Sequence, residues 1–121
     1  MNCKQIIRNW QGVEVGEETI GSLLANTVAN SKSEKGTVIM AFTLAQRLDS
    51  SDELELTSDE QVYLHDVIDL SEGMLAWAKA VAHYLVEPAW VDEKDRKVFE
   101  AVYSSPVPVT DNGSGKTDKL V

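Results

Sequence analysis

The chain has 121 residues, of which 43% are hydrophobic and 26% charged, and its formal net charge at pH 7 is −9. This length suits one domain, and this composition is typical of a globular protein that folds without a structural metal or a disulfide framework. So acidic a chain is a poor ligand for nucleic acid or anionic membranes, which bind clusters of Lys and Arg.

The cysteine content and the hydropathy of the chain indicate where the protein works. Cys3 is the one cysteine, and a lone thiol cannot staple a fold, which favours a reducing compartment. No window approaches the ~20 apolar residues that cross a bilayer. The first residues also lack an apolar stretch of signal-peptide length. We therefore expect a cytoplasmic protein.

The first elements that the sequence predicts are a β-hairpin and a helix. Residues 4–16 combine β-branched, aromatic and alternating side chains, which is typical of a hairpin that turns near Gly12. Thr19 can cap a helix over 19–30, because the apolar residues that follow it recur at the spacing i, i+3, i+4 and i+7.

Ser33 can begin a second helix, which is predicted over residues 34–48. Its segment from Thr37 to Gln46 carries no charge, so we expect this helix to be central and Phe42 to be buried. The alternation over 53–57 that follows is consistent with a third short strand, added to the hairpin.

The second half of the chain is predicted to be helical. Thr57 starts a helix over 58–86, because a carboxylate follows it at capping-box spacing and apolar residues then recur every three or four positions. Gly73 either leaves this helix whole or breaks it in two. Pro88 ends helical propagation, and a last short helix is predicted over 92–103.

These elements together predict a mainly α fold with a small N-terminal β-hairpin, an α+β arrangement with four or five helices around one core. The globular domain should span residues 1–104. Residues 105–121 hold Pro and Gly and few large apolar side chains, so we expect a disordered tail there. A Gly-Lys-Thr string at 115–117 lacks the leading glycine of a P-loop and its strand-to-helix setting, so we expect no nucleotide binding.

The clearest feature in the charge pattern is a stretch from Asp49 to Glu72 that is rich in carboxylates and contains no Lys or Arg. Its one-signed field could steer a basic protein partner, whereas the structural alternative is an ordinary solvated face. Trp90, at a helix junction, either seals the turn or protrudes toward a partner. The residues that we expect to bind a partner are Asp49, Asp52, Glu53, Glu55, Asp66, Asp69, Glu72 and Trp90.

The two histidines offer a catalytic or metal-binding alternative. His65 and His83 each have a carboxylate four residues on, which places each pair on one helix face. Zinc sites draw three or four His or Cys ligands, so exposed helix pairs are favoured over a metal site. No metal, cofactor or catalytic residue is predicted, because no nucleophile has a recognisable sequence context.

The order of the segments ETIGSLLAN (18–26), FTLAQRL (42–48) and LELTSDE (54–60) after the hairpin resembles small uncharacterised proteins of tailed phages and prophages. The resemblance covers roughly residues 4–87 and carries over no catalytic or binding residue. It implies a non-enzymatic accessory protein in the cytoplasm of a bacterial host.

We therefore expect a protein that binds another protein through its acidic surface, either an assembly partner in the virion or a host factor that it inhibits. A homo-oligomer is compatible with the sequence. The alternative is a small metal- or nucleotide-dependent enzyme or regulator that uses His65 and the nearby carboxylates.

Overall fold

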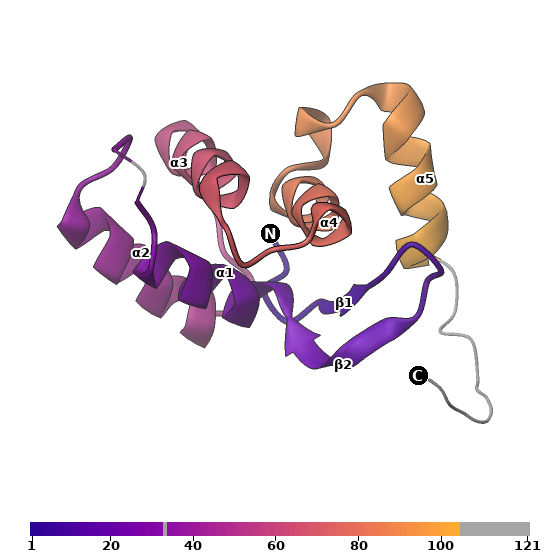
Figure 1. Cartoon of the computed structure of the whole chain (residues 1–121), viewed down its shortest axis with the longest axis horizontal. Coiled ribbons are helices and arrows are strands. Elements are labelled where there is room, and N and C mark those ends of the chain that lie inside the picture. The colour runs from indigo at the N-terminus through magenta and orange to yellow at the C-terminus, as the bar shows by residue number, and fades with distance from the viewer. Residues whose placement is uncertain (33, 105–121) are drawn as a thin grey trace.

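The computed structural model describes residues 1–32 and 34–104. These residues form five α-helices and an N-terminal antiparallel hairpin, which confirms the predicted mainly helical fold (Figure 1). The tail expected over 105–121 lies outside the described residues. The elements in chain order are β1 (Ile6–Arg8), β2 (Glu14–Thr19), α1 (Ile20–Ala29), α2 (Val38–Ser50), α3 (Ser58–Leu70), α4 (Ala76–Val86), the 3₁₀ turn η1 (Pro88–Trp90) and α5 (Glu93–Ser104).

The hairpin turns at Gly12, as predicted. Gly12 has a φ of 79°, a conformation that side chains disfavour. The Asn9 side chain accepts hydrogen bonds from the backbone N–H groups of Gln11 and Val13, at 2.8 and 3.2 Å. A short polar side chain that bonds to its own turn explains why the chain reverses here.

The two strands pair with an irregular register, and β2 runs to Thr19 rather than ending near residue 16. Ile6 lies opposite Thr19 and Arg8 lies opposite Glu14, so β2 contributes more residues than β1 between these pairs. Gly16, with a φ of 60°, lies inside this bulge. The bulge lengthens β2 until it joins α1 directly.

The core lies where α1 packs against α2, α3 and α4. Thr19 caps α1 as predicted, because its hydroxyl accepts the N–H of Ser22. At Gly21 an added Cβ would come within 2.8 Å of atoms of Cys3 and within 2.5 Å of the Leu48 carbonyl oxygen. Only glycine permits this close approach. The largest fully buried aliphatic side chains are Ile20, Leu24, Leu44, Leu48, Leu64 and Ile68.

The second helix starts later than the predicted residue 34. α2 begins at Val38, because the Thr37 hydroxyl accepts the Met40 N–H at 3.0 Å and caps the helix there. Just before the cap, Gly36 lies against the ring of Tyr63, where a Cβ would come within 2.8 Å. This packing fixes the preceding segment outside the helix.

The helix predicted over 58–86 is two helices. Thr57 and Glu60 form the expected capping box at the start of α3, but α3 ends at Leu70 and α4 begins at Ala76. Gly73 lies in the connection between them, so the second of the two alternatives is correct. α4 then turns back along α3, which lets the two helices face each other.

The third strand proposed over 53–57 is instead a single bridge between Asn2 and Glu53. The N–H of Leu54 donates to the Met1 carbonyl at 2.9 Å, and the N–H of Cys3 donates to the carbonyl of Asp52 at 2.8 Å. The segment pairs with the first residues rather than with the hairpin, because Leu54 is buried in the core and holds the backbone there.

Helix α5 lies beside the hairpin, at the opposite end of the molecule from α2 (Figure 1). The Tyr103 hydroxyl accepts the N–H of Arg8 at 2.8 Å and donates to the Arg8 carbonyl at 3.2 Å. The Arg8 guanidinium donates to the carbonyl of Val102 at 2.7 Å. Tyr84 of α4 stacks on Phe99, with ring centroids 4.9 Å apart. Of the helices in the described residues, none has both the length and the apolarity needed to span a bilayer.

Candidate functional site

The acidic stretch does not form one continuous surface. Asp49, Asp52, Glu53 and Glu55 are exposed at the end of α2 and in the connection to α3. Asp69 and Glu72 are exposed at the other end of α3, which is about 20 Å long. Asp66, between the two groups, is half-buried. We call the group formed by Asp49, Asp52, Glu53 and Glu55 the acidic corner.

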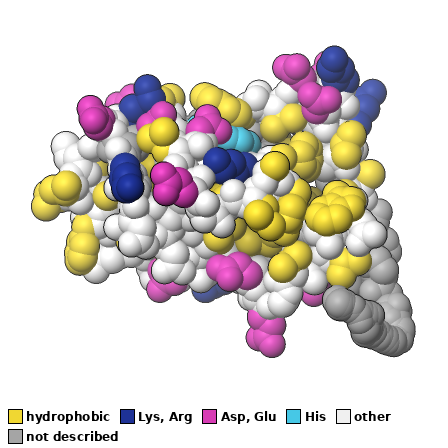
Figure 2. Space-filling view, in the orientation of Figure 1, with side chains coloured by type: hydrophobic (Ala, Val, Ile, Leu, Met, Phe, Trp, Pro, Cys, Tyr) yellow, Lys and Arg dark blue, Asp and Glu magenta, His cyan; other side chains and the backbone are white. Residues whose placement is uncertain are grey.

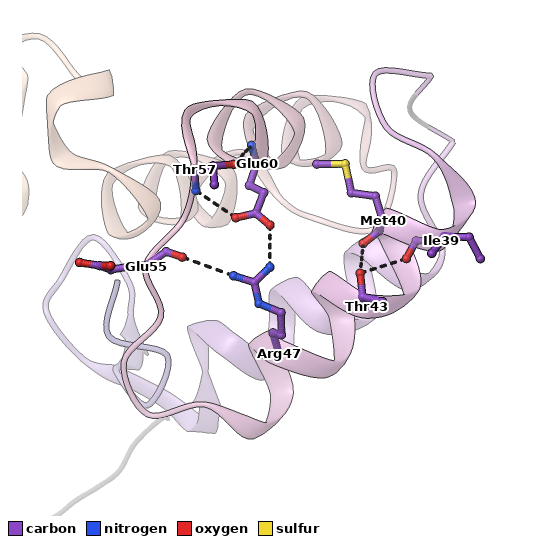
Figure 3. A network of polar contacts seen from close by, with 7 residues as sticks. All are labelled: Ile39, Met40, Thr43, Arg47, Glu55, Thr57 and Glu60. Carbon is purple, nitrogen blue, oxygen red and sulfur yellow. Dashed lines mark hydrogen bonds and ion pairs between the residues drawn. The ribbon is translucent and has the colours of Figure 1, made fainter.

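Cations from outside the stretch neutralise part of its charge. Arg47 of α2 donates to the Glu60 carboxylate at 2.6 Å and to the Glu55 carbonyl at 3.3 Å (Figure 3). The hydrogen bond from Arg47 is the main cause that lowers the pKa of Glu60. Lys4 lies 4.0 Å from Asp52, an exposed pair that is worth little. Arg47 and Glu60 therefore join α2 to α3, and Glu60 has a structural role.

The outer face of α2 is apolar and open to solvent, which corrects the prediction that Phe42 is buried. Phe42 is 64% exposed, Ile39 69% and Val38 84%. Apolar side chains protrude at the edge of the molecule where α2 lies (Figure 2). The absence of charge in this segment predicts burial, but the structure places these three side chains on the surface.

The exposed face of α2 leads from these apolar side chains to the acidic corner. Ile39, Phe42, Gln46 and Asp49 follow one another at spacings of three and four, which places them on one stripe of the helix. All four are exposed. The opposite stripe carries Leu44 and Leu48, which α1 and the core cover. The stripe therefore has an apolar half and an acidic end.

A second arrangement of interest is a polar ladder between α3 and α4. Gln61 donates to the Glu87 carboxylate at 3.3 Å, and His65 and His83 lie 2.6 Å apart through their Nδ1 atoms. One turn further on, Lys79 donates to the Asp69 carbonyl at 2.9 Å. Each step moves four residues forward on α3 and four back on α4. The two helices are therefore antiparallel and joined at successive turns.

The histidine prediction was wrong about partners and exposure. His65 is 1% exposed and bonds to His83 of the facing helix rather than to Asp69 of its own. His83 bonds to Asp69 through Nε2 at 2.8 Å. The result is a chain of contacts that runs from the exposed Asp69 carboxylate through His83 to the buried His65.

The two imidazole rings meet edge to edge. Their planes differ by 20° and their centroids are 4.9 Å apart. Rings stacked face to face lie about 3.5 Å apart or more, so an Nδ1 to Nδ1 distance of 2.6 Å requires the rings to be nearly coplanar. The contact is a hydrogen bond in the ring plane.

Trp90 covers the buried histidine. Its ring stacks face to face on His65, with centroids 3.7 Å apart and planes 8° apart, while Trp90 itself is 52% exposed. Trp90 therefore covers His65 at the helix junction with one face and presents the rest of its surface to solvent. Burial, as the main cause, and the neighbouring His83 together lower the pKa of His65 to about 4.

A shallow groove of about 370 Å³ lies between the end of α1 and the α3–α4 connection. Leu23 and Met74 contribute to its apolar lining, and Asn26, Lys32 and Glu72 to its polar lining. The lining includes neither His65 nor the outer face of α2. The groove therefore lies away from His65, the residue that the enzymatic alternative would use.

The described residues place no group of three or more His, Cys, Asp or Glu side chains where they could hold a metal ion. No protein-family model matches the sequence, and no curated protein or solved structure matches it.

Proposed function

We propose that this protein acts by binding another protein through the outer face of α2, with the acidic corner at one end of the contact. The observation that carries the proposal is the exposure of three large apolar side chains, Val38, Ile39 and Phe42, on a single helix. Neighbouring apolar side chains at this exposure lower the free energy of a complex when a partner covers them. Each is worth about 1.5 to 3 kcal/mol when fully buried.

The charge beside this face indicates the chemistry of the partner. Asp49 lies on the same stripe as Phe42, and Asp52 and Glu53 follow it in the exposed connection. A partner segment with apolar residues next to Lys or Arg would complement both halves of the surface. A second copy of this chain complements it poorly, because each copy carries a net charge of −9.

The resemblance to small proteins of tailed phages suggests two classes of partner. One is a structural protein of the virion, which this protein would assist in assembly. The other is a protein of the bacterial host, which it would inhibit. A partner of either class would bind the same surface of this protein. One experiment therefore tests the surface and identifies the partner.

Site-specific photocrosslinking tests the proposal. A photoreactive phenylalanine analogue is placed at Phe42 and, in a matched control, at Val98 on α5, which is 63% exposed. We expect a discrete crosslinked protein from position 42 in infected or lysogenic cells, and not from position 98. Equal crosslinking at both positions, or none at position 42, would contradict a binding face on α2.

A further inference from the structure

The hydrogen bond between His65 and His83 needs one N–H and one lone pair, so the two Nδ1 atoms share a single proton. In one arrangement both rings are neutral: His65 donates from Nδ1, and His83 donates from Nε2 to Asp69. In the other, His83 has gained a proton and donates from both nitrogens, while His65 accepts at Nδ1 and carries its own proton on Nε2. His65 is neutral in both.

We infer that this pair is an acid-operated latch between α3 and α4, which keeps its hydrogen bond when it takes up one proton and releases it when it takes up a second. One added proton leaves the bond intact, because the two Nδ1 atoms still hold one N–H and one lone pair between them, and the Asp69 carboxylate, 2.8 Å from Nε2 of His83, accepts from that nitrogen. The second proton makes both Nδ1 atoms donors. Two donors cannot share the bond, and two adjacent cations repel each other.

The surroundings of His65 oppose the second proton. Its Nε2 is buried and has no hydrogen-bond partner within the described residues. The carboxylates of Asp69 on α3 and Glu87 at the end of α4 favour a proton on His65, whereas burial and His83 act against it and prevail, so that the pKa of His65 is lowered. Lys79 of α4 contacts the Asp69 backbone carbonyl rather than either imidazole.

Opening of the latch would free Trp90. The ring of Trp90 is held by its stack on His65, and the short turn that carries it is fixed to α4 through Glu87, whose side chain accepts the Ala89 N–H at 3.2 Å. Once His65 becomes charged and loses His83, it moves toward water and the stack is lost. Acid would therefore expose the covered face of Trp90.

Nuclear magnetic resonance of the whole protein labelled with ¹⁵N tests the latch. At pH 7 we expect a scalar coupling across the hydrogen bond between the Nδ1 nuclei of His65 and His83. This coupling should disappear on acidification in the same step in which the indole N–H resonance of Trp90 shifts. His83→Gln is the matched variant, because glutamine can accept the hydrogen bond from a protonated His65 without becoming a cation.

The variant separates the latch from general acid unfolding. In His83→Gln we expect the Trp90 resonance to keep its pH 7 position through the pH range in which the wild-type resonance shifts. The inference is overturned if the coupling is absent at pH 7, if it disappears without a change at Trp90, or if Trp90 shifts equally in His83→Gln. If the variant does not fold, the scalar coupling between His65 and His83 in the wild-type protein, and its loss together with the Trp90 shift, test the inference without it.

Discussion

Phe42 and Leu44 lie two residues apart on α2 and point in opposite directions. Leu44 is fully buried against the core, whereas Phe42 is 64% exposed. The same helix therefore supplies part of the core with one face and an uncovered apolar surface with the other. The proposed function depends on this second face.

The two positions should differ sharply in their effect on stability. Leu44→Ala should lower the free energy of unfolding by about 2 to 5 kcal/mol, because it leaves a cavity in the core. Phe42→Ala should change it by about 0.5 kcal/mol or less, as at other exposed positions. Urea unfolding of both variants measures this difference. A loss at Phe42 as large as that at Leu44 would place Phe42 in the core.

The sequence predicts where most elements begin, because local chemistry decides it. Thr19 and Thr57 are followed by the residues that a helix cap requires, and Gly12 sits where the hairpin needs a positive φ. The sequence does not determine which side of α2 faces the core, because apolar residues occur on both of its sides. Only the position of α1 determines which side is covered.

Stability should fall when the pH drops below 7, because of His65. Its pKa is about 4 in the folded protein, with burial as the main cause, against 6.5 for an ordinary histidine. The unfolded chain therefore binds this proton more tightly, so the stabilisation is complete above pH 6.5 and is lost as the pH falls toward 4. We expect a decrease of about 2 kcal/mol in the free energy of unfolding between pH 7 and pH 5.

Urea unfolding at several pH values, with His65→Gln as the control, measures this dependence. The variant should not show this decrease, because it lacks the His65 imidazole. An equal decrease in His65→Gln would assign the effect to other groups.

Tyr103 should control the docking of α5. Its hydroxyl bonds to both the N–H and the carbonyl of Arg8, so Tyr103→Phe leaves a backbone N–H without that partner, at a cost of about 1 to 3 kcal/mol. Tyr84→Phe, which keeps the ring stacked on Phe99, is the control. Hydrogen exchange should accelerate at Arg8 and along α5 in the first variant. Unchanged exchange would show that the hydroxyl does not anchor the helix.

The candidate sites could be predicted only in part from the sequence. The acidic stretch is visible, but Lys4 and Arg47, which lie before it in the chain, reach parts of it only after folding. His65 has a carboxylate at helical spacing, yet its partner is His83. The connection at Gly73 reverses the chain, and this reversal brings the two histidines together. Contacts within a helix follow from spacing, whereas contacts between helices follow from topology.

The dissociation constant of the partner captured at position 42 tests the binding face most directly. Phe42→Ser should raise it roughly 30-fold, the effect of about 2 kcal/mol at a central contact, while Val98→Ser should change it less than twofold. Changing Asp49, Asp52 and Glu53 together to Lys should weaken binding and reduce its dependence on salt. Equal affinities for the Phe42→Ser and Val98→Ser variants would contradict a binding face on α2.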